Sequence, residues 1–335
     1  MQVNTLDLAA FRFDFGLTWA VLFMNADRTV YGRYGSRSNA EGTSDVTLKG
    51  FRQAALAALE IHRGYPANRD SLAGKAGPAP RFPTPRGYPS LKDFPAAVDP
   101  AAGERHNPTC IHCHQIDAAE YRWTREAKQP VPDRLLWAYP APRALGLEFD
   151  PEERARIRSV VPGSPAEKAG FREKDDLILL GGQSLISIAD VHWVLEHAAE
   201  GAVLKAEVRR GAGSASLSLP LPPGWRRKGD FSWRSTMGEE IGPEVSGEGL
   251  APAERRALGL SEEAIALRIR RAGSAFAGDA LRKDDVLVEV DGLRSGLATF
   301  SEFLAHLAQK KERGDRVAVT VLREGKEVRG WIVAR

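Results

Sequence analysis

The segment Cys110-Ile111-His112-Cys113-His114 carries the residues whose types and spacing are best suited to chemistry. Two thiols three residues apart can add to the two vinyl groups of a haem, and the histidine that follows can supply an axial nitrogen to the iron. The chain has only these two cysteines, so its cysteine usage is concentrated in one motif. The pattern predicts haem c, held by Cys110, Cys113 and His114.

Three alternatives stay open for this motif. A Cys-x-x-Cys pair can act as a thiol–disulfide centre in which the intervening residues tune the nucleophile. Such a centre usually follows a strand directly, and a proline-rich segment precedes this one. The two thiols could also bind zinc together with two of the histidines His106, His112 and His114, although these ligands would be unusually close together in the sequence. The third alternative is that the motif holds no cofactor.

The local sequence Thr109–Gln115 also resembles the attachment sites of cytochromes c. Met237 is the only methionine that follows, so the sixth iron position is expected to be open or held by another histidine, with His106 and His62 as candidates. Haem c is attached outside the bacterial cytoplasm, and this implies an exported, periplasmic protein. The start of the chain has no basic region followed by an apolar one. We therefore expect either a natural start upstream of Met1 or a cytoplasmic protein.

A repeat occupies the C-terminal half, where the segment 163–182 matches the segment 273–292 at a constant offset. Each copy continues with the pattern of an amphipathic helix and then of a β-hairpin. We therefore predict two related domains, at 141–222 and 250–335, separated by a linker at 223–249. The helices are expected at 188–198 and 299–309, and the hairpins turn at 211–213 and 324–325.

The repeat resembles the PDZ domains of bacterial exported proteases. In that family an apolar-Gly-apolar loop presents backbone N–H groups to the C-terminal carboxylate of a peptide, because a glycine lets successive amides converge on an anion. The next strand, here expected at 154–161 and 264–271, then pairs with the peptide. The resemblance implies six peptide-binding residues, which are Leu145, Gly146 and Leu147 in the first copy and Leu258, Gly259 and Leu260 in the second.

The second copy departs further from the family's pattern than the first. Lys174 and Asp284 stand where a glycine is usual, and only the second copy also changes the turn residues at 275–276 and 279–280. We therefore expect the first copy to be the better ligand binder. The sequence shows no Gly-x-Ser-x-Gly elbow and no His-Glu-x-x-His helix, so no protease is indicated. The helix histidines His192 and His197 are expected to be exposed or half-packed.

The N-terminal stretch, 1–65, has the pattern of a hairpin followed by a helix. Apolar residues at 18–24, a turn at 25–28 and alternation at 29–34 predict two strands, and 48–62 has helical spacing. This unit resembles the second half of a thioredoxin-like domain. A half-domain would leave a sheet edge bare, which is costly, so we expect the natural chain, and any redox active site of that domain, to begin upstream.

The whole chain resembles a bacterial family that joins a thioredoxin-like domain to PDZ domains, some members of which carry selenocysteine. The resemblance rests on residues 25–27, 31–35, 64–68, 110–115 and 221–225.

The expected architecture is a partial thioredoxin-like α/β unit at 1–65, a proline-rich connector with the CxxCH motif at 66–140, and two mostly β PDZ domains with helices. Nine of the 21 prolines fall at 65–108, so that stretch is expected to be extended, with its aromatic residues docked.

The expected function is that of an exported, redox-associated protein that binds peptide C-termini or extended segments. A thiol–disulfide oxidoreductase with PDZ substrate-binding modules and a plain PDZ adaptor are the alternatives. A redox partner is expected only if the motif is active. The net charge of +3 and the mixed distribution of charges argue against nucleic acid, and no apolar stretch is long enough to span a membrane.

Overall fold

The computed structural model describes residues 3–39, 42, 44–98, 109–229, 231, 233–234, 236–237, 245–273 and 281–334. The chain forms two compact units, and each takes residues from two stretches. Unit 1 comprises 1–116 and 137–229, and unit 2 comprises 117–136 and 230–335. His106 and the turn of the second repeat at 274–280 lie outside the described residues.

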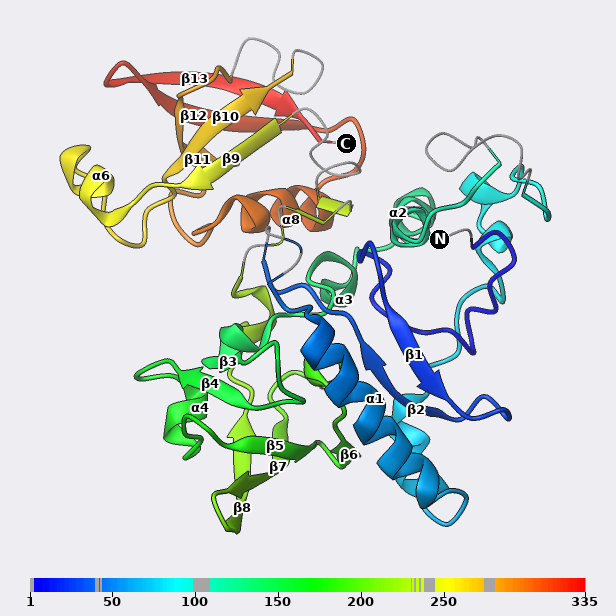
Figure 1. Ribbon diagram of the computed structural model, residues 1–335. Coiled ribbons are helices and arrows are strands. Elements are labelled where there is room, and N and C mark those ends of the chain that lie inside the picture. The colour runs from blue at the N-terminus through cyan, green and yellow to red at the C-terminus, as the bar shows by residue number, and fades with distance from the viewer. Residues whose placement is uncertain are drawn as a thin grey trace. The chain divides into compact units, whose positions relative to one another are not determined.

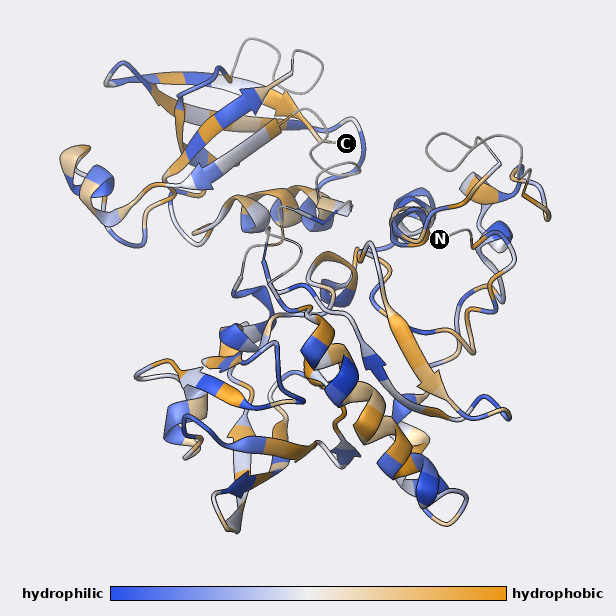
Figure 2. Cartoon of the chain, in the orientation of Figure 1, coloured by the Kyte–Doolittle hydropathy of each residue, from blue (hydrophilic) through white to orange (hydrophobic). Residues whose placement is uncertain are grey.

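Unit 1 begins with the predicted hairpin and helix. Strands β1 (Val21–Met24) and β2 (Val30–Tyr34) pair antiparallel, and helix α1 (Leu48–Arg63) begins where the side chain of Thr47 accepts a hydrogen bond from the Gly50 N–H (Figure 1). Figure 2 shows that β1 is apolar along its length. The hairpin and the helix are confirmed, and their assignment to a thioredoxin-like domain stays a prediction.

The proline-rich segment docks on unit 1, as its aromatic residues predicted, but it forms short helical turns where an extended chain was expected. Leu72 packs in one buried cluster with residues of β2, of α1 and of the segment before α5, and Tyr88 and Leu91 are also buried. The turns are the 3-10 helices η1 (Arg69–Lys75), η2 (Pro85–Gly87) and η3 (Pro89–Leu91). Pro85 and Pro89 begin η2 and η3, where the fixed φ of proline suits a helical turn and its missing N–H is not needed, whereas η1 contains no proline.

The rest of unit 1 is a small β domain. Its strands form a two-stranded sheet, β3–β4, and a four-stranded antiparallel sheet in the order β6-β5-β7-β8 (Figure 1). The elements in chain order are η5 (Pro142–Leu145), β3 (Leu147–Phe149), β4 (Ile157–Val160), α4 (Pro165–Lys168), β5 (Asp176–Leu180), β6 (Gln183–Ser184), α5 (Ile188–Glu196), β7 (Val203–Arg210), β8 (Gly213–Pro220) and η6 (Trp225–Arg227).

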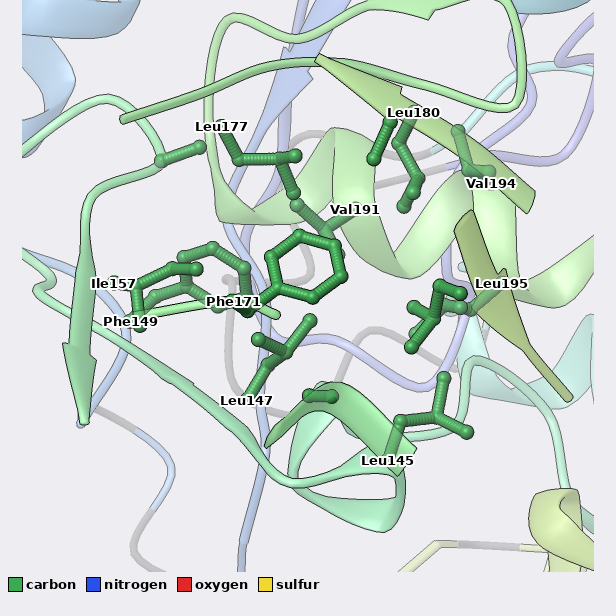
Figure 3. Close-up of a cluster of buried hydrophobic side chains, with 14 of the residues drawn as sticks. Leu145, Leu147, Phe149, Ile157, Phe171, Leu177, Leu180, Val191, Val194 and Leu195 are labelled. Carbon is green, nitrogen blue, oxygen red and sulfur yellow. The ribbon is translucent and has the colours of Figure 1, made fainter. Parts of the chain in front are cut away.

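The core of this domain lies between the strands and helix α5. Leu145 and Leu147 point into it from the loop before β3, and Val191 and Leu195 point into it from α5 (Figure 3). Trp225 belongs to the same buried cluster. The expected linker at 223–249 is therefore wrong at its start, because η6 completes this core.

Unit 2 repeats much of this element order. One antiparallel sheet has the order β13-β12-β11-β10-β9, and helices α2 and α3 precede it in the chain. Gln309 donates to the side chain of Asp133 at 2.7 Å, and Arg125 donates to the Ala308 carbonyl at 2.9 Å. The bounds are α2 (His114–Glu126), α3 (Asp133–Leu136), β9 (Val245–Gly249), α6 (Pro252–Ala257), β10 (Leu267–Ala272), β11 (Val286–Val290), α8 (Phe300–Lys310), β12 (Arg316–Arg323) and β13 (Lys326–Val333).

The predicted helices and hairpins of both copies are confirmed to within a few residues. Two boundaries differ from the prediction. Strand β9 begins the sheet of unit 2 inside the expected linker, and helix α6 is inserted between β9 and β10, where unit 1 has only a turn between β3 and β4. Within the described residues, no helix is both long and apolar enough to cross a membrane.

Candidate functional site

Strand β3 has one edge available for pairing. The Val161 N–H donates to the Gly146 carbonyl at 2.9 Å, and Leu147 lies opposite Val160. Hydrogen-bonded and non-hydrogen-bonded pairs alternate along an antiparallel ladder, so the N–H and C=O of Leu147 point away from β4. Among the described residues, no strand pairs with that edge.

The strand that sequence analysis expected to pair with a peptide, at 154–161, is occupied on both edges. One edge pairs with β3, and on the other the Ile157 N–H donates to the Asp175 carbonyl at 2.8 Å while the Leu177 N–H donates to the Ala155 carbonyl at 3.0 Å. The expectation is therefore wrong by one strand. The short β3, which directly follows the glycine loop, is the edge strand.

The loop before β3 requires glycine for two separate reasons. Gly146 has a φ of +91°, a conformation that other residues rarely adopt, and its N–H donates to the Arg143 carbonyl to end η5. A Cβ at this position would overlap the side chain of Ser164, which caps helix α4 by accepting from the Glu167 N–H. The loop thus packs closely on α4 and holds the Leu147 N–H toward the open edge.

Charged groups flank this edge. Glu148 forms ion pairs with Arg143 and Arg158 and accepts a hydrogen bond from the Ser159 hydroxyl at 2.6 Å. The Ser159 hydroxyl above all, and then the two arginines, hold the pKa of Glu148 below its usual range. The side chain of Arg143 is 73% exposed, so it is accessible to a ligand's carboxylate beside the glycine loop.

Helix α5, which crosses the middle of this domain, is buried on all sides. Its residues 188–195 are each at most 6% exposed. Ile188, Val191, Val194 and Leu195 pack in the domain core. The opposite side is covered by the N-terminal segment, residues 30–75, which runs from β2 to η1. This cover explains why a helix with polar residues such as Asp190 has no exposed face.

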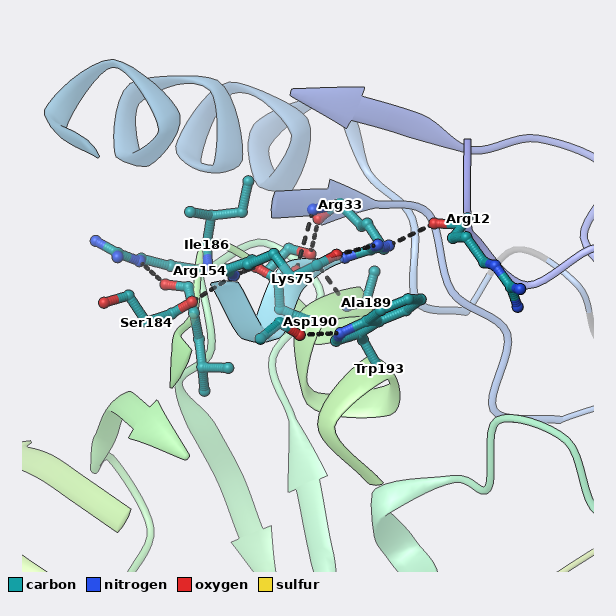
Figure 4. A network of polar contacts seen from close by, with 12 residues as sticks. Arg12, Arg33, Lys75, Arg154, Ser184, Ile186, Ala189, Asp190 and Trp193 are labelled. Carbon is teal, nitrogen blue, oxygen red and sulfur yellow. Dashed lines mark hydrogen bonds and ion pairs between the residues drawn. The ribbon is translucent and has the colours of Figure 1, made fainter. Parts of the chain in front are cut away.

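A buried polar network joins α5 to that segment (Figure 4). Asp190 accepts from the Lys75 ammonium at 2.8 Å, from the Arg33 N–H at 3.1 Å and from the Ile186 N–H at 3.0 Å. The Arg33 guanidinium lies 3.4 Å from the ring centroid of Trp193, whose indole N–H donates to the Gly74 carbonyl. Burial lowers the pKa of Lys75, and Asp190 opposes that shift.

The two histidines of α5 have different environments. His192 is buried, with its Nδ1 3.2 Å from the Tyr139 carbonyl and its Nε2 3.3 Å from the Ser38 hydroxyl. The expectation that it is exposed or half-packed is therefore wrong, because the N-terminal segment covers this side of α5. His197 is exposed, and its ring packs on Trp193 with the centroids 4.0 Å apart.

The predicted loop of the second copy, Leu258–Leu260, does not lead into a strand edge. It ends helix α6, where the Gly259 N–H donates to the Arg256 carbonyl, and Leu258 is 40% exposed. Strand β10 pairs with β9 on one edge and β11 on the other. The prediction is wrong because the two loops do not share the register of the repeat. The shift that carries 163–182 onto 273–292 carries 144–147 onto 254–257, which lies inside α6.

In unit 2 the strand equivalent to β3 is β9, and helix α8 packs tightly against it. A Cβ on Gly247 would lie 2.7 Å from the ring of Phe300 at the start of α8. Phe300 is buried. A side chain of the protein itself therefore fills the space between this strand and its helix.

The cysteine motif lies at the end of the first stretch of unit 1. Cys110 is buried and Cys113 is partly exposed, and no disulfide joins the two. The Ile111 N–H donates to the Asn4 side chain at 2.7 Å, and the Val3 N–H donates to the Ile111 carbonyl at 3.1 Å. These bonds fix the backbone between the thiols.

Helix α2 begins only at His114, so the two thiols precede the helix. The rings of His112 and His114 are stacked with centroids 5.8 Å apart, and burial together with the nearby His114 lowers the pKa of His112. Among the described residues, no group of three or more His, Cys, Asp or Glu side chains could hold a metal. Haem, zinc and dithiol chemistry stay predictions.

Residues 143–221 match the family model of the PDZ domain. The chain is similar to the 26S proteasome non-ATPase regulatory subunit 9 of Mus musculus, with 29% identity over 192 residues, 51% of this chain and 81% of that protein. It is also similar to the serine protease HTRA1 of Xenopus tropicalis, with 38% identity over 65 residues, 19% of this chain and 14% of that protein.

A solved structure of an HtrA-type protease, AlgWS227A with decapeptide, matches with 16% identity and a TM-score of 0.25 over 54% of each chain, so the chain spans about half of that structure's length. The sequence matches show a PDZ domain related to those of HtrA-type proteases. A PDZ domain indicates a peptide or protein partner. The thioredoxin-like part and the second PDZ domain stay predictions.

Proposed function

We propose that the PDZ domain of unit 1 binds an extended peptide by adding it as a strand to β3. The orientation of Leu147 carries this proposal, since its N–H and C=O face the edge that no described strand occupies. Main-chain hydrogen bonds of this kind supply affinity, and side-chain pockets supply specificity. A free peptide C-terminus would lie at the glycine loop, beside the exposed Arg143.

Hydrogen exchange of individual amides tests this assignment. A peptide that binds at β3 is expected to protect the amide of Leu147, whereas the amide of Val161, already bonded to Gly146, is expected to change little. The probe is the tightest binder from a library of random peptides with free C-termini, compared with its C-terminal amide. Loss of affinity on amidation would locate the carboxylate at the loop.

Two results separate the proposal from its alternatives. Protection confined to β9 would move the peptide site to unit 2, and protection in neither strand would contradict strand addition altogether. Replacing Arg143 with Gln is expected to weaken the free-acid peptide more than the amide. Equal weakening of both would refute the placement of the carboxylate.

The cysteine motif supports a second candidate function, a redox role for an exported protein. The supporting observation is that no disulfide joins Cys110 and Cys113 and that His114 opens helix α2. If haem were bound, the two thiols would hold its porphyrin and His114 would hold its iron, which would supply electron-transfer chemistry. A dithiol at the same place would instead exchange with the disulfide of a redox partner.

Periplasmic expression with haem-maturation machinery, followed by intact mass and a visible spectrum, tests the haem assignment. A Soret band and a haem-sized mass increment are expected, and both should be lost in a Cys110→Ser variant. Absence of both from the wild-type protein would refute it. Thiol titration with an insulin-reduction assay would then test the dithiol, and inactivity there would leave an adaptor that acts through peptide binding alone.

A further inference from the structure

A cavity of about 330 Å³ in unit 1 lies between the segment at 9–12, the β1–β2 turn and η1. Its size is at the lower end of small-molecule sites, which occupy roughly 300–1,000 Å³. Its walls combine apolar residues, among them Ala9 and Leu72, with two carboxylates and five basic side chains. The basic residues are Arg12, Arg28, Arg33, Arg69 and Lys75.

The buried part of this wall has an excess of positive charge. Arg33 and Lys75 are 3% and 1% exposed, and the buried carboxylate of Asp190 pairs with the Lys75 ammonium but accepts from Arg33 only through its main-chain N–H. The Asp27 carboxylate at the rim accepts from the Tyr65 hydroxyl and the Thr29 N–H, and it lies 3.9 Å from the exposed Arg69 guanidinium, so it compensates charge at the rim and not at the buried wall. Burying a charge without a compensating partner is costly. An anion in the cavity would offset the charge that the protein leaves uncompensated.

The guanidinium of Arg33 retains an unused donor. Its Nε donates to the Arg12 carbonyl at 2.7 Å and its Nη2 to the Lys75 carbonyl at 2.8 Å, whereas its buried Nη1 has no hydrogen-bond partner among the described residues (Figure 4). The stacking on Trp193 holds the group in place. Burial lowers the pKa of Arg33 to about 10, so it is still a cation at neutral pH.

We propose that this cavity binds a small anion with a carboxylate or phosphate group. Arg33 supplies the fixed donor, Arg12 and Arg69 close on the oxyanion from the rim, and Ala9 and Leu72 contact the body of the ligand. A planar guanidinium fits both kinds of oxyanion, often with two parallel hydrogen bonds. The site is distinct from the open edge of β3, and its assignment does not rest on the proposed peptide binding.

Isothermal titration of the full chain with inorganic phosphate, and separately with succinate, tests the proposal at constant ionic strength in chloride. Binding of either anion supports it, and the tighter of the two identifies the kind of oxyanion. The single variants Arg12→Gln and Arg69→Gln should each raise Kd by about tenfold, the usual effect of losing one hydrogen bond to a charged group. Arg63→Gln, at the exposed end of α1 and outside the cavity, is the matched control and should leave Kd unchanged.

Two outcomes would overturn the proposal. One is that neither anion binds the wild-type protein. That result is expected if a single water satisfies the Nη1 donor from a neighbouring cavity of about 10 Å³, which is lined by Arg33, Tyr139 and His192. The other is that both anions bind the Arg12→Gln/Arg69→Gln double variant as tightly as the wild type. Thermal unfolding without added anion checks that the variants fold, since Arg69 is 64% exposed at the rim.

Discussion

Replacing Gly146 with alanine perturbs the glycine loop through two separable effects. At a φ of +91° an alanine costs about 1–2 kcal/mol because of its backbone conformation. Its Cβ would also overlap Ser164, so the Ser164 side chain must move and helix α4 loses its cap, which costs about 1 kcal/mol. The sum is a loss of about 2–3 kcal/mol in the free energy of unfolding.

A second substitution separates the two terms. Ser164→Gly removes the overlapping side chain, and glycine at a cap position costs only a few tenths of a kcal/mol relative to serine. In that background Gly146→Ala should cost only its backbone term, so a double-mutant cycle should give a coupling of about 1 kcal/mol. Urea unfolding of the four proteins provides the free energies, with the midpoint of Gly146→Ala expected to fall by about 1–2 M.

The reasoning fails if the cost of Gly146→Ala is the same with and without Ser164, because the loop would then not pack on α4 as described. A cost within about 0.5 kcal/mol, the range of substitutions that disturb no special feature, would mean that the loop relaxes out of the left-handed conformation. Peptide affinity is measured on the Gly146→Ala/Ser164→Gly double variant, which keeps its core, so that a change in affinity reports on the loop and not on stability. We expect the affinity to fall there, since the altered loop no longer fixes the Leu147 N–H.

Three further predictions concern packing and charge. Asp190→Asn should lower the free energy of unfolding by about 3–5 kcal/mol, because the side chains of Asp190 and Lys75 are both 1% exposed and the ammonium would lose its charged partner. Adding Lys75→Met to that variant should recover part of the lost stability, as measured by thermal unfolding. Because the pKa of Glu148 is lower in the folded than in the unfolded chain, its stabilising contribution is present above about pH 4.5 and is lost as pH falls below that value. Glu148→Gln should flatten that decline in urea unfolding between pH 5 and pH 3, and an unchanged slope would contradict the assignment. Gly247→Ala should cost about 1–3 kcal/mol, because its Cβ meets the Arg268 carbonyl and the ring of Phe300, and a neutral effect would contradict this close packing of β9.

The regular elements of the repeat could be predicted because their signals are local. An amphipathic period places α5 and α8, and alternating residues that turn at 211–213 and 324–325 place the hairpins. The matched glycine loops could not be assigned in the same way. Ala-Leu-Gly-Leu ends η5 before a strand in one copy and ends the inserted helix α6 in the other, and the different register of these two loops relative to the repeat was the available signal in the sequence.

The partners of α5 could not be predicted from the sequence for a different reason. Asp190 lies 115 residues from Lys75 and 157 from Arg33, and nothing in the sequence around either cation indicates a buried carboxylate as its partner. An acidic residue on an otherwise apolar helix was the available signal, since a charge is rarely buried without a partner. It indicates that a partner exists and says nothing of where in the chain that partner lies.

The covering of α5 changes how the PDZ domain must be understood. The sequence predicts an independent domain. In the structure, the side of α5 that faces away from the core is covered by Arg33, Lys75 and the turn around Gly74. The same Arg33 and Lys75 line the basic cavity, so an anion there contacts residues that fix α5, and α5 packs against the loop and strand that would hold a peptide. Since both ligands would contact residues that hold helix α5 in place, each is expected to alter the affinity of the other, and any such coupling must be reciprocal. The N-terminal segment is thereby part of the binding domain's structure and not a separate attachment to it.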